Sequence, residues 1–209
     1  MIQEDAPFIR EGHYRVMNIY LVRHGESVGN QKRLFFGTTD YPLTEKGWED
    51  AHRVAEKLKD VSVEVCYTSG LQRAYNTAEI CWPGDPDLIQ RTTNLNEQHI
   101  GKFEGREYSD LLKDYPELAE KMKRNWIGTK APDGETFDEV RARVKVVLDE
   151  ILSHGKDTMV VAHNGSLMAM LDLMMDLPTH MHDRMWFEHG SYSLVSLREK
   201  GFVLHVFNR

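Results

Sequence analysis

Cysteine and long hydrophobic runs are both scarce in this sequence. Its 209 residues include only two cysteines, Cys66 and Cys81, and these form no Cys-x-x-Cys pair, so neither a disulfide framework nor a zinc ribbon is expected. No apolar stretch approaches the roughly 18 residues of a transmembrane helix. Residues 1–16 also lack the apolar core of a secretion signal. These absences predict a protein of the reduced cytoplasmic compartment that does not span a membrane.

Positive charge is in the minority, because 26 Lys and Arg face 33 Asp and Glu for a net charge of −7. This deficit argues against non-specific nucleic-acid binding, but a small anionic ligand responds to the local field of a cleft and stays compatible. Hydrophobic residues make up 41% of the chain and charged residues 28%, which are ordinary globular values. The length suits one large or two small domains. Histidine, in contrast, is abundant, with ten residues.

Apolar, β-prone runs alternate with helical patterns along most of the chain. We interpret residues 1–16 as a polar N-terminal leader and residues 17–209 as a single domain, with a helical insertion at about 105–135. Helices are predicted after Thr44, after a capping box at residues 69–72, after a second capping box at 136–139, and over 164–175. This order predicts an α/β fold with a mostly parallel central sheet and an antiparallel edge formed by the last hairpin. The predicted strands are 17–22, 63–67, 88–93, 158–162, 193–198 and 202–207.

Polar, reactive side chains follow four of the predicted strands. In open α/β sheets, ligands bind beyond the carboxyl ends of the strands, so these residues are expected to face one crevice. They are Arg23, His24, Gly25 and Glu26 after the first strand, Thr68, Ser69 and Arg73 after the second, Asn96 and Glu97 after the third, and His163, Asn164 and Gly165 after the fourth.

This set suits the transfer of a phosphoryl group from an alcohol oxygen to an imidazole nitrogen. Two arginines can hold a dianion through forked hydrogen bonds, and the helix that begins at Asn164 offers free N–H groups. One histidine must be neutral to attack, while the other can be cationic and bind phosphate. A protonated carboxyl group would protonate the leaving alkoxide. The arginines would stabilise the transferring charge in place of Mg²⁺.

Each of these residues also has a simpler interpretation. Arg73 could be an ion-pair partner for Glu79 or Asp85, and Glu97 could be a solvated loop carboxylate. Asn164 and Gly165 could merely form a turn and a helix start. The chemical interpretation depends on all four strand ends acting together.

The sequence resembles the histidine phosphatase superfamily, also called phosphoglycerate mutase-like. The match runs from about residue 17 to 207, and its motifs are specific when taken jointly. They are Leu-Val-Arg-His-Gly-Glu-Ser at 21–27 with Asn30, residues 37–44 with Gly47, residues 67–74 with Thr77 and Ala78, residues 95–97, Gly101 with Glu104 and Gly105, residues 132–136, and Val-Val-Ala-His-Asn-Gly at 160–165.

The resemblance implies a three-layer α/β/α sandwich that needs neither metal nor cofactor. It implies that His24 is the phosphorylated nucleophile and that Glu97 donates a proton to the leaving group. It also implies a phosphate- and substrate-binding set that comprises Arg23, Asn30, Arg73, His163, Asn164, Gly37 and Thr38.

The superfamily contains phosphatases and mutases, and this chain resembles the phosphatase branch more closely. Cofactor-dependent phosphoglycerate mutases typically place Arg-His-Tyr after the acid, where this chain has Gln-His-Ile at 98–100. They also carry paired arginines between the acid and the second histidine, and no such pair occurs here. We therefore predict a metal-independent phosphomonoester phosphatase of the histidine acid phosphatase type. The alternatives are a phosphoglycerate mutase and a non-catalytic phosphoester-binding module.

The predicted partner is a small phosphorylated metabolite or inorganic phosphate, with no nucleic acid and no membrane. Basic residues at the pocket mouth would favour a second phosphate or a carboxylate, and aromatic residues would favour a ring. A solvated helical face is the alternative for these residues. The sequence leaves the physiological substrate and the oligomeric state open, a homo-oligomer included. The residues concerned are Lys32, Arg33, Phe35, Phe36, Lys102, Arg106, Tyr108, Lys121, Lys123, Arg124 and Trp126.

Overall fold

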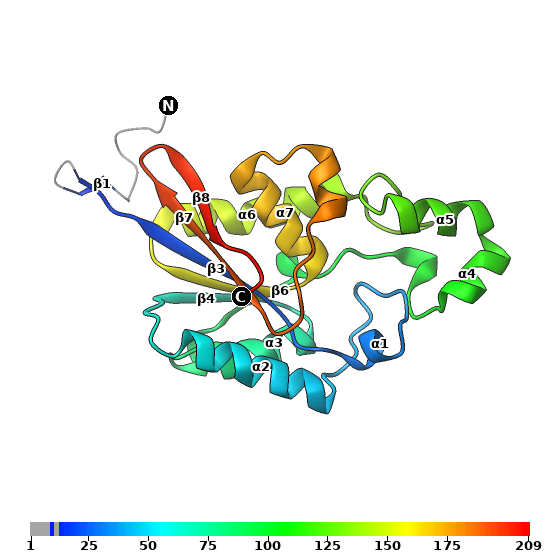
Figure 1. Ribbon diagram of the computed structural model, residues 1–209, viewed down its shortest axis with the longest axis horizontal. Coiled ribbons are helices and arrows are strands. Elements are labelled where there is room, and N and C mark those ends of the chain that lie inside the picture. Colours follow the sequence, from blue (N-terminus) through cyan, green and yellow to red (C-terminus); the bar gives the residue numbers. More distant parts are fainter. Residues whose placement is uncertain (1–8, 11–12) are drawn as a thin grey trace.

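The computed structural model describes residues 9–10 and 13–209, and its centre is a mixed six-stranded sheet (Figure 1). The strand order is β5-β4-β6-β3-β7-β8. The first four strands in this order run parallel to one another, and β7 pairs antiparallel with both β3 and β8, so the last hairpin supplies the predicted antiparallel edge. The strands are β3 (Met17–Arg23), β4 (Val65–Ser69), β5 (Gln90–Thr92), β6 (Thr158–Ala162), β7 (Tyr192–Arg198) and β8 (Gly201–Val206).

Helices cover both faces of this sheet, which makes the predicted three layers (Figure 1). One face carries α2 (Glu45–Leu58) and α3 (Gln72–Cys81), and the other carries α6 (Phe137–His154) and α7 (Asn164–Met175). Side chains of β3 alternate between the two layers: Ile19 packs in the core with α6 and α7, and Tyr20 packs in the core with α2 and α3. Strands buried on both faces read as continuous apolar runs, which is why the sequence reveals them.

Two predicted helix starts have the expected geometry. Thr44 accepts a hydrogen bond from the Gly47 amide at the start of α2. At the start of α6, Thr136 and Glu139 form the reciprocal capping box. The remaining short helices are α1 (Val28–Gln31), η1 (Pro86–Leu88), η2 (Thr93–Leu95), η3 (Gly101–Phe103) and η4 (Thr179–Arg184).

The predicted capping box at residues 69–72 is wrong. Ser69 is the last residue of β4, and α3 begins at Gln72 with Leu71 at its N-cap. The first-turn amide of Gln72 donates to the carboxylate of Asp40 instead. The serine hydroxyl is therefore available to the site described below.

The predicted strand 63–67 lies at Val65–Ser69 in the structure, because its partner strand β6 begins only at Thr158, opposite Val65. The predicted strand 88–93 shortens to Gln90–Thr92, between two 3₁₀ turns.

The helical insertion contains α4 (Tyr108–Asp114) and α5 (Pro116–Arg124), and Pro116 occupies the first turn of α5, where its missing N–H costs no hydrogen bond. The insertion has a small core of its own, with Phe103, Leu111 and Ala119 fully buried. In Figure 1 it extends away from the helical layers.

At the N-terminal end, β1 (Ile9–Arg10) and β2 (His13–Tyr14) pair as a short antiparallel ribbon. The rest of the predicted leader up to that point, residues 1–8 and 11–12, lies outside the described residues. Within the described ranges, no helix has both the length and the hydrophobicity to cross a membrane.

Candidate active site

Residues from all four of the predicted strand ends line one cavity of about 370 Å³, although Glu26, Thr68, Ser69, Asn96 and His163 are not among its lining residues. Arg23, His24, Arg73, Glu97 and Asn164 all line it, as the strand-end argument predicts. Its volume suits part of a small organic ligand.

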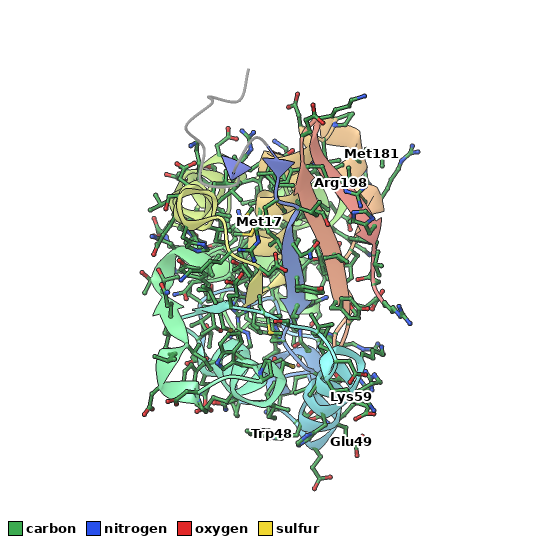
Figure 2. All side chains as sticks on the ribbon, turned by 90° about the vertical axis from the view of Figure 1, so that its left-hand side faces the viewer. Met17, Trp48, Glu49, Lys59, Met181 and Arg198 are labelled. Carbon is green, nitrogen blue, oxygen red and sulfur yellow. The ribbon has the colours of Figure 1, made fainter. Side chains whose placement is uncertain are left out.

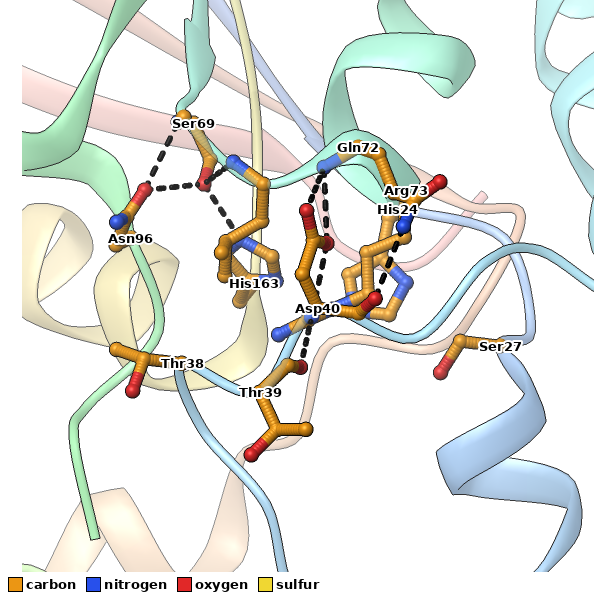
Figure 3. A network of polar contacts seen from close by, with 12 residues as sticks. His24, Ser27, Thr38, Thr39, Asp40, Ser69, Gln72, Arg73, Asn96 and His163 are labelled. Atoms are coloured by element: carbon orange, nitrogen blue, oxygen red, sulfur yellow. Dashed lines mark hydrogen bonds and ion pairs between the residues drawn. The ribbon is translucent and has the colours of Figure 1, made fainter. Parts of the chain in front are cut away.

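His163 is fully buried beside this cavity, with its ring centroid 4.9 Å from that of His24. Figure 3 shows His24, Arg73 and His163 close together, with Ser69 and Asn96 next to His163.

His24 is held in one tautomer by the backbone. Its Nδ1 lies 2.7 Å from the carbonyl oxygen of Gly25, and because a carbonyl can only accept, Nδ1 carries the proton. Burial lowers the pKa of His24 well below its ordinary value of 6.5, and the neighbouring His163 and Arg73 lower it further. A neutral ring with a protonated Nδ1 leaves the lone pair on Nε2.

Glycine is required next to His24 by the close approach of two backbone segments. A Cβ on Gly25 would lie 2.0 Å from the carbonyl oxygen of Gly47 in the first turn of α2. The Gly25 amide in turn donates to the hydroxyl of Thr77 on α3, at 3.2 Å. Two helices therefore determine the position of the His24 backbone.

Both arginines are buried, and both donate to backbone carbonyls. Arg73 donates to the carbonyls of Gly37 and Thr39, at 2.6 and 2.9 Å, and Arg23 donates to that of Phe187. Burial lowers the pKa of each guanidinium to about 10, against the opposing effect of Glu97, so both remain charged at neutral pH.

The alternative for Arg73, an ion pair with Glu79 or Asp85, is not what the structure shows. Among the described residues, its carboxylate partner is Asp40, at 3.8 Å.

The loop that receives Arg73 is organised by a half-buried carboxylate. Glu104 accepts hydrogen bonds from the amides of Gly37, Thr38, Thr39 and Ile100, at 3.0 to 3.2 Å. Burial by itself would raise the pKa of Glu104, but these bonds and that from the Thr39 hydroxyl outweigh it and lower the pKa.

The backbone amides of Gly37 and Thr38 therefore donate to Glu104, and neither residue lines the cavity. The structure gives them a supporting place beneath Arg73, and direct contact with a substrate stays a prediction. A Cβ on Gly37 would lie 1.6 Å from the carbonyl oxygen of Gln98, so this position also needs glycine.

His163 is oriented by a chain of hydrogen bonds (Figure 3). Ser69 Oγ lies 2.8 Å from both His163 Nε2 and Asn96 Oδ1. Since Asn96 Oδ1 can only accept, Ser69 donates to it and accepts from His163, which places the imidazole proton on Nε2. The buried Nδ1 of His163 has no hydrogen-bond partner among the described residues. An anion in the cavity would favour a second proton there.

The carboxyl group of Glu97 is fixed at the start of α7. Its oxygens accept from the amides of Gly165 and Gln98, at 3.0 and 2.9 Å. A Cβ on Gly165 would lie 2.3 Å from Glu97 Oε1, so the close packing needs glycine. Glu97 is therefore a positioned carboxyl group and not a freely solvated one.

Asn30 and Asn164 have clear structural partners as well as places in the cavity wall. Asn30 Oδ1 accepts from the amide and the hydroxyl of Ser27, which closes the turn after the His24 loop. Asn164 Oδ1 accepts from the Phe187 amide at 3.0 Å, and the Phe187 carbonyl holds Arg23.

Sequence reasoning missed a third histidine. His189 lies with its ring centroid 5.3 Å from that of His24, and its buried Nε2 has no partner within the described part of the chain. Burial and the charges of Arg23, Lys46 and Arg73 lower its pKa to about 3. The antiparallel course of β7 could have revealed it, because it brings the residues before Tyr192 to the carboxyl end of β3.

Of the residues proposed for the pocket mouth, four line the cavity, namely Arg33, Phe35, Phe36 and Trp126. The cavity lining does not include Lys32, Lys102, Arg106, Tyr108, Lys121, Lys123 or Arg124.

Comparison with known proteins finds relatives that match most of the chain. The chain is 30% identical over 190 residues to a probable phosphoglycerate mutase GpmB of Yersinia pestis (strain Pestoides F), covering 90% of this chain and 88% of that protein. The structure of a putative alpha-ribazole-5'-P phosphatase from Escherichia coli matches with a TM-score of 0.83 at 27% identity, covering 92% and 96%. A mycobacterial glucosyl-3-phosphoglycerate phosphatase shares the fold with a TM-score of 0.82 at 23% identity, covering 92% and 98%.

A family model defines the class more broadly. The model of the histidine phosphatase superfamily (branch 1) matches residues 19–209, and the chain therefore belongs to this superfamily.

Three histidines of the site, His24, His163 and His189, have lowered pKa values and predict that the free energy of unfolding decreases in mild acid. Folding lowers the pKa values of these histidines, so below about pH 6.5 the unfolded chain binds more protons than the folded protein. The free energy of unfolding therefore decreases as the pH is lowered, by up to about 1.4 kcal/mol per pH unit for each site. Urea unfolding at pH 7 and pH 5.5 measures this slope. His189→Gln should reduce it, whereas His52→Gln, which changes an exposed histidine of α2, is the matched control. An equal loss of slope in both variants contradicts the assignment.

Proposed function

We propose that this protein is a metal-independent phosphomonoester phosphatase that acts through a phosphohistidine at His24. The observation that carries the proposal is the neutral His24, with Nδ1 bonded to Gly25 and Nε2 available, in a cavity that contains two buried arginines. A small phosphorylated metabolite is the substrate that this cavity volume suits.

In the first half of the reaction, Arg23, Arg73 and protonated His163 bind the three peripheral oxygens of the phosphate. His24 Nε2 attacks phosphorus, a P–N bond forms and the P–O bond to the alcohol breaks. Glu97 gives its proton to the departing alkoxide, so a neutral alcohol leaves. The arginines stabilise the charge that spreads over the transferring group.

In the second half, Glu97 is a carboxylate and can take a proton from an incoming water. The resulting hydroxide attacks phosphorus, the P–N bond breaks and His24 is released neutral. The products are inorganic phosphate and an enzyme in its starting protonation state. A single carboxyl group thus serves both halves, first as acid and then as base.

A mutase is the second candidate, and it is supported by the name of the Yersinia relative and by Arg33 in the cavity wall. Apart from the two buried arginines, Arg33 is the basic side chain that the cavity offers to the carboxylate of a phosphoglycerate. A mutase must retain substrate while its phosphohistidine waits, and one exposed arginine gives little retention. This observation favours hydrolysis.

We also propose a reduced, cytoplasmic location. Cys66 and Cys81 are both buried free thiols, and burial raises the pKa of each, that of Cys81 to about 12. Thiols in this state suit a reducing compartment. Nucleic acid, membrane and a second copy of the chain are not required by the proposed reaction.

His24→Ala is expected to lower kcat for p-nitrophenyl phosphate at least about a thousandfold in buffer containing excess EDTA, because the P–N bond cannot form. Release of p-nitrophenolate measures the rate. His205→Ala, on the exposed side of β8, is the matched control and should match the wild type. Loss of wild-type activity with EDTA alone, or full activity of His24→Ala, would refute the mechanism.

Glu97→Gln should separate substrates by their leaving groups. An alkyl phosphate needs a proton on its leaving oxygen, so its kcat should fall by about 10² to 10⁴. The leaving group of p-nitrophenyl phosphate is a stable anion, so the rate of its first half-reaction should fall less. Burst-phase kinetics isolates that step. The wild-type rate should be highest between mildly acidic and neutral pH, and a rate that still rises above about pH 9 is incompatible with Glu97 as the acid.

Product analysis distinguishes the two candidate reactions. With 3-phosphoglycerate and 2,3-bisphosphoglycerate supplied together, we expect the release of inorganic phosphate. We expect 2-phosphoglycerate to form no faster than inorganic phosphate is released. Phosphorus NMR follows both products in one sample. Interconversion of the monophosphates that outpaces phosphate release would establish the mutase instead.

A further inference from the structure

The cavity has two chemically different parts. The reacting groups occupy one part, and the remaining wall consists mostly of apolar side chains. These are Leu34, Phe35, Phe36, Ile100, Met122 and Trp126. The loop after His24 and the helical insertion supply most of them, so this wall is formed by segments outside the central sheet.

The aromatic members of this wall are held in place by other rings. Phe35 stacks on Tyr108 with ring centroids 5.9 Å apart and an interplanar angle of 21°. Trp126 meets Phe137 edge-on, with centroids 5.6 Å apart at 87°. A ligand therefore meets fixed apolar surfaces that lose little side-chain freedom when it binds.

Two rings that line the cavity, those of Phe36 and Trp186, lie next to the arginines of the proposed phosphate site. The Arg73 guanidinium lies over Phe36 and that of Arg23 lies over Trp186, each 5.0 Å from the ring centroid. Trp186 is 50% exposed, although large aromatic side chains are usually more deeply buried. The peripheral oxygens of a bound phosphate would thus contact arginines that are themselves covered by aromatic faces.

The polar side chains of this wall are few. Beyond the reacting residues they are Asn30, Arg33 and Gln98. Asn30 Oδ1 accepts from Ser27, and the Gln98 amide donates to the Glu135 carbonyl at 2.7 Å, so the donors that remain for a ligand include the Asn30 amide nitrogen and the exposed Arg33 guanidinium. Over the rest of this wall the hydroxyl groups of a sugar would lose water against apolar side chains and gain no hydrogen bond, which is unfavourable.

Resting on the proposed function, we infer that the alcohol part of the preferred substrate is a flat, apolar ring system, so that the substrate is an aromatic or arylalkyl phosphomonoester. The phosphate binds to the arginines, and the ring packs against Trp186 on one side and the wall of the insertion on the other. Sugar phosphates and phosphoglycerates are then poor substrates.

Benzyl phosphate and glycerol 1-phosphate provide the test, because both release a primary alkoxide and differ mainly in what the cavity must bind. An aromatic ring that removes roughly 100 Å² of apolar surface from water predicts a kcat/KM at least about thirtyfold higher for benzyl phosphate. Equal values, or a preference for glycerol 1-phosphate, would overturn the inference and leave the proposed phosphatase intact.

Two tryptophans that are both about half exposed serve as test and matched control. Trp186→Ala should lower the ratio of the two kcat/KM values about tenfold, and Trp186→Phe should restore most of it. Trp48 is 42% exposed and lies on α2 at the edge of the molecule in Figure 2. It does not line the cavity, so Trp48→Ala should leave the ratio unchanged. Equal effects of the two alanine variants would contradict a wall at Trp186.

If neither ester is hydrolysed, the proposed function fails, and binding still tests the inference. Calorimetry then compares benzylphosphonate with 2,3-dihydroxypropylphosphonate, two non-hydrolysable analogues. Tighter binding of benzylphosphonate that weakens about tenfold in Trp186→Ala supports the apolar substrate class. Equal or weaker binding overturns it.

Discussion

The buried guanidinium of Arg73 imposes a constraint that shapes the whole site. Its charge is accommodated by the carbonyls of Gly37 and Thr39, with the carboxylate of Asp40 3.8 Å away. Two carbonyls point at one guanidinium only if their loop is held in a tight conformation, and Glu104 holds it by accepting three consecutive amides. The guanidinium is thereby fixed in position, with Asp40 at the edge of hydrogen-bond range, and its charge suits the phosphate dianion of the proposed reaction.

Burial, and with it the same charge, lowers the pKa values of the neighbouring imidazoles of His24 and His163. A neutral His24 is what the proposed nucleophilic role requires, whereas the proposed role of His163 requires it to gain a proton when an anion binds. Two chemically identical side chains thus acquire different tasks from their hydrogen bonds: His24 Nδ1 donates to a carbonyl, and His163 Nε2 donates to Ser69. The net charge of −7 belongs to the rest of the molecule and does not oppose phosphate in the cavity.

Much of this arrangement was predictable from the sequence, because it depends on local signals and one general rule. The buried parallel strands read as apolar runs, and the rule that their carboxyl ends meet at one edge brings Arg23, Glu97 and His163 together. Contacts between distant segments were not predictable in this way. Glu104 gives no local sign that it serves residues 37–39. Ser69 matches a capping pattern, yet its hydroxyl contacts His163. His189 precedes an antiparallel strand, which the carboxyl-end rule for parallel strands does not cover.

The position of β3 in the sheet has a consequence for the order in which the protein matures. This strand carries Arg23 and His24 near the beginning of the chain, but both its neighbours, β6 and β7, come from the last third. Contacts between such distant segments form slowly, since a long loop must close before they stabilise the fold. Without its last third the chain has His24 but lacks His163 and the Phe187 carbonyl that holds Arg23. The surroundings of His24 are therefore assembled only after these late segments have joined the sheet.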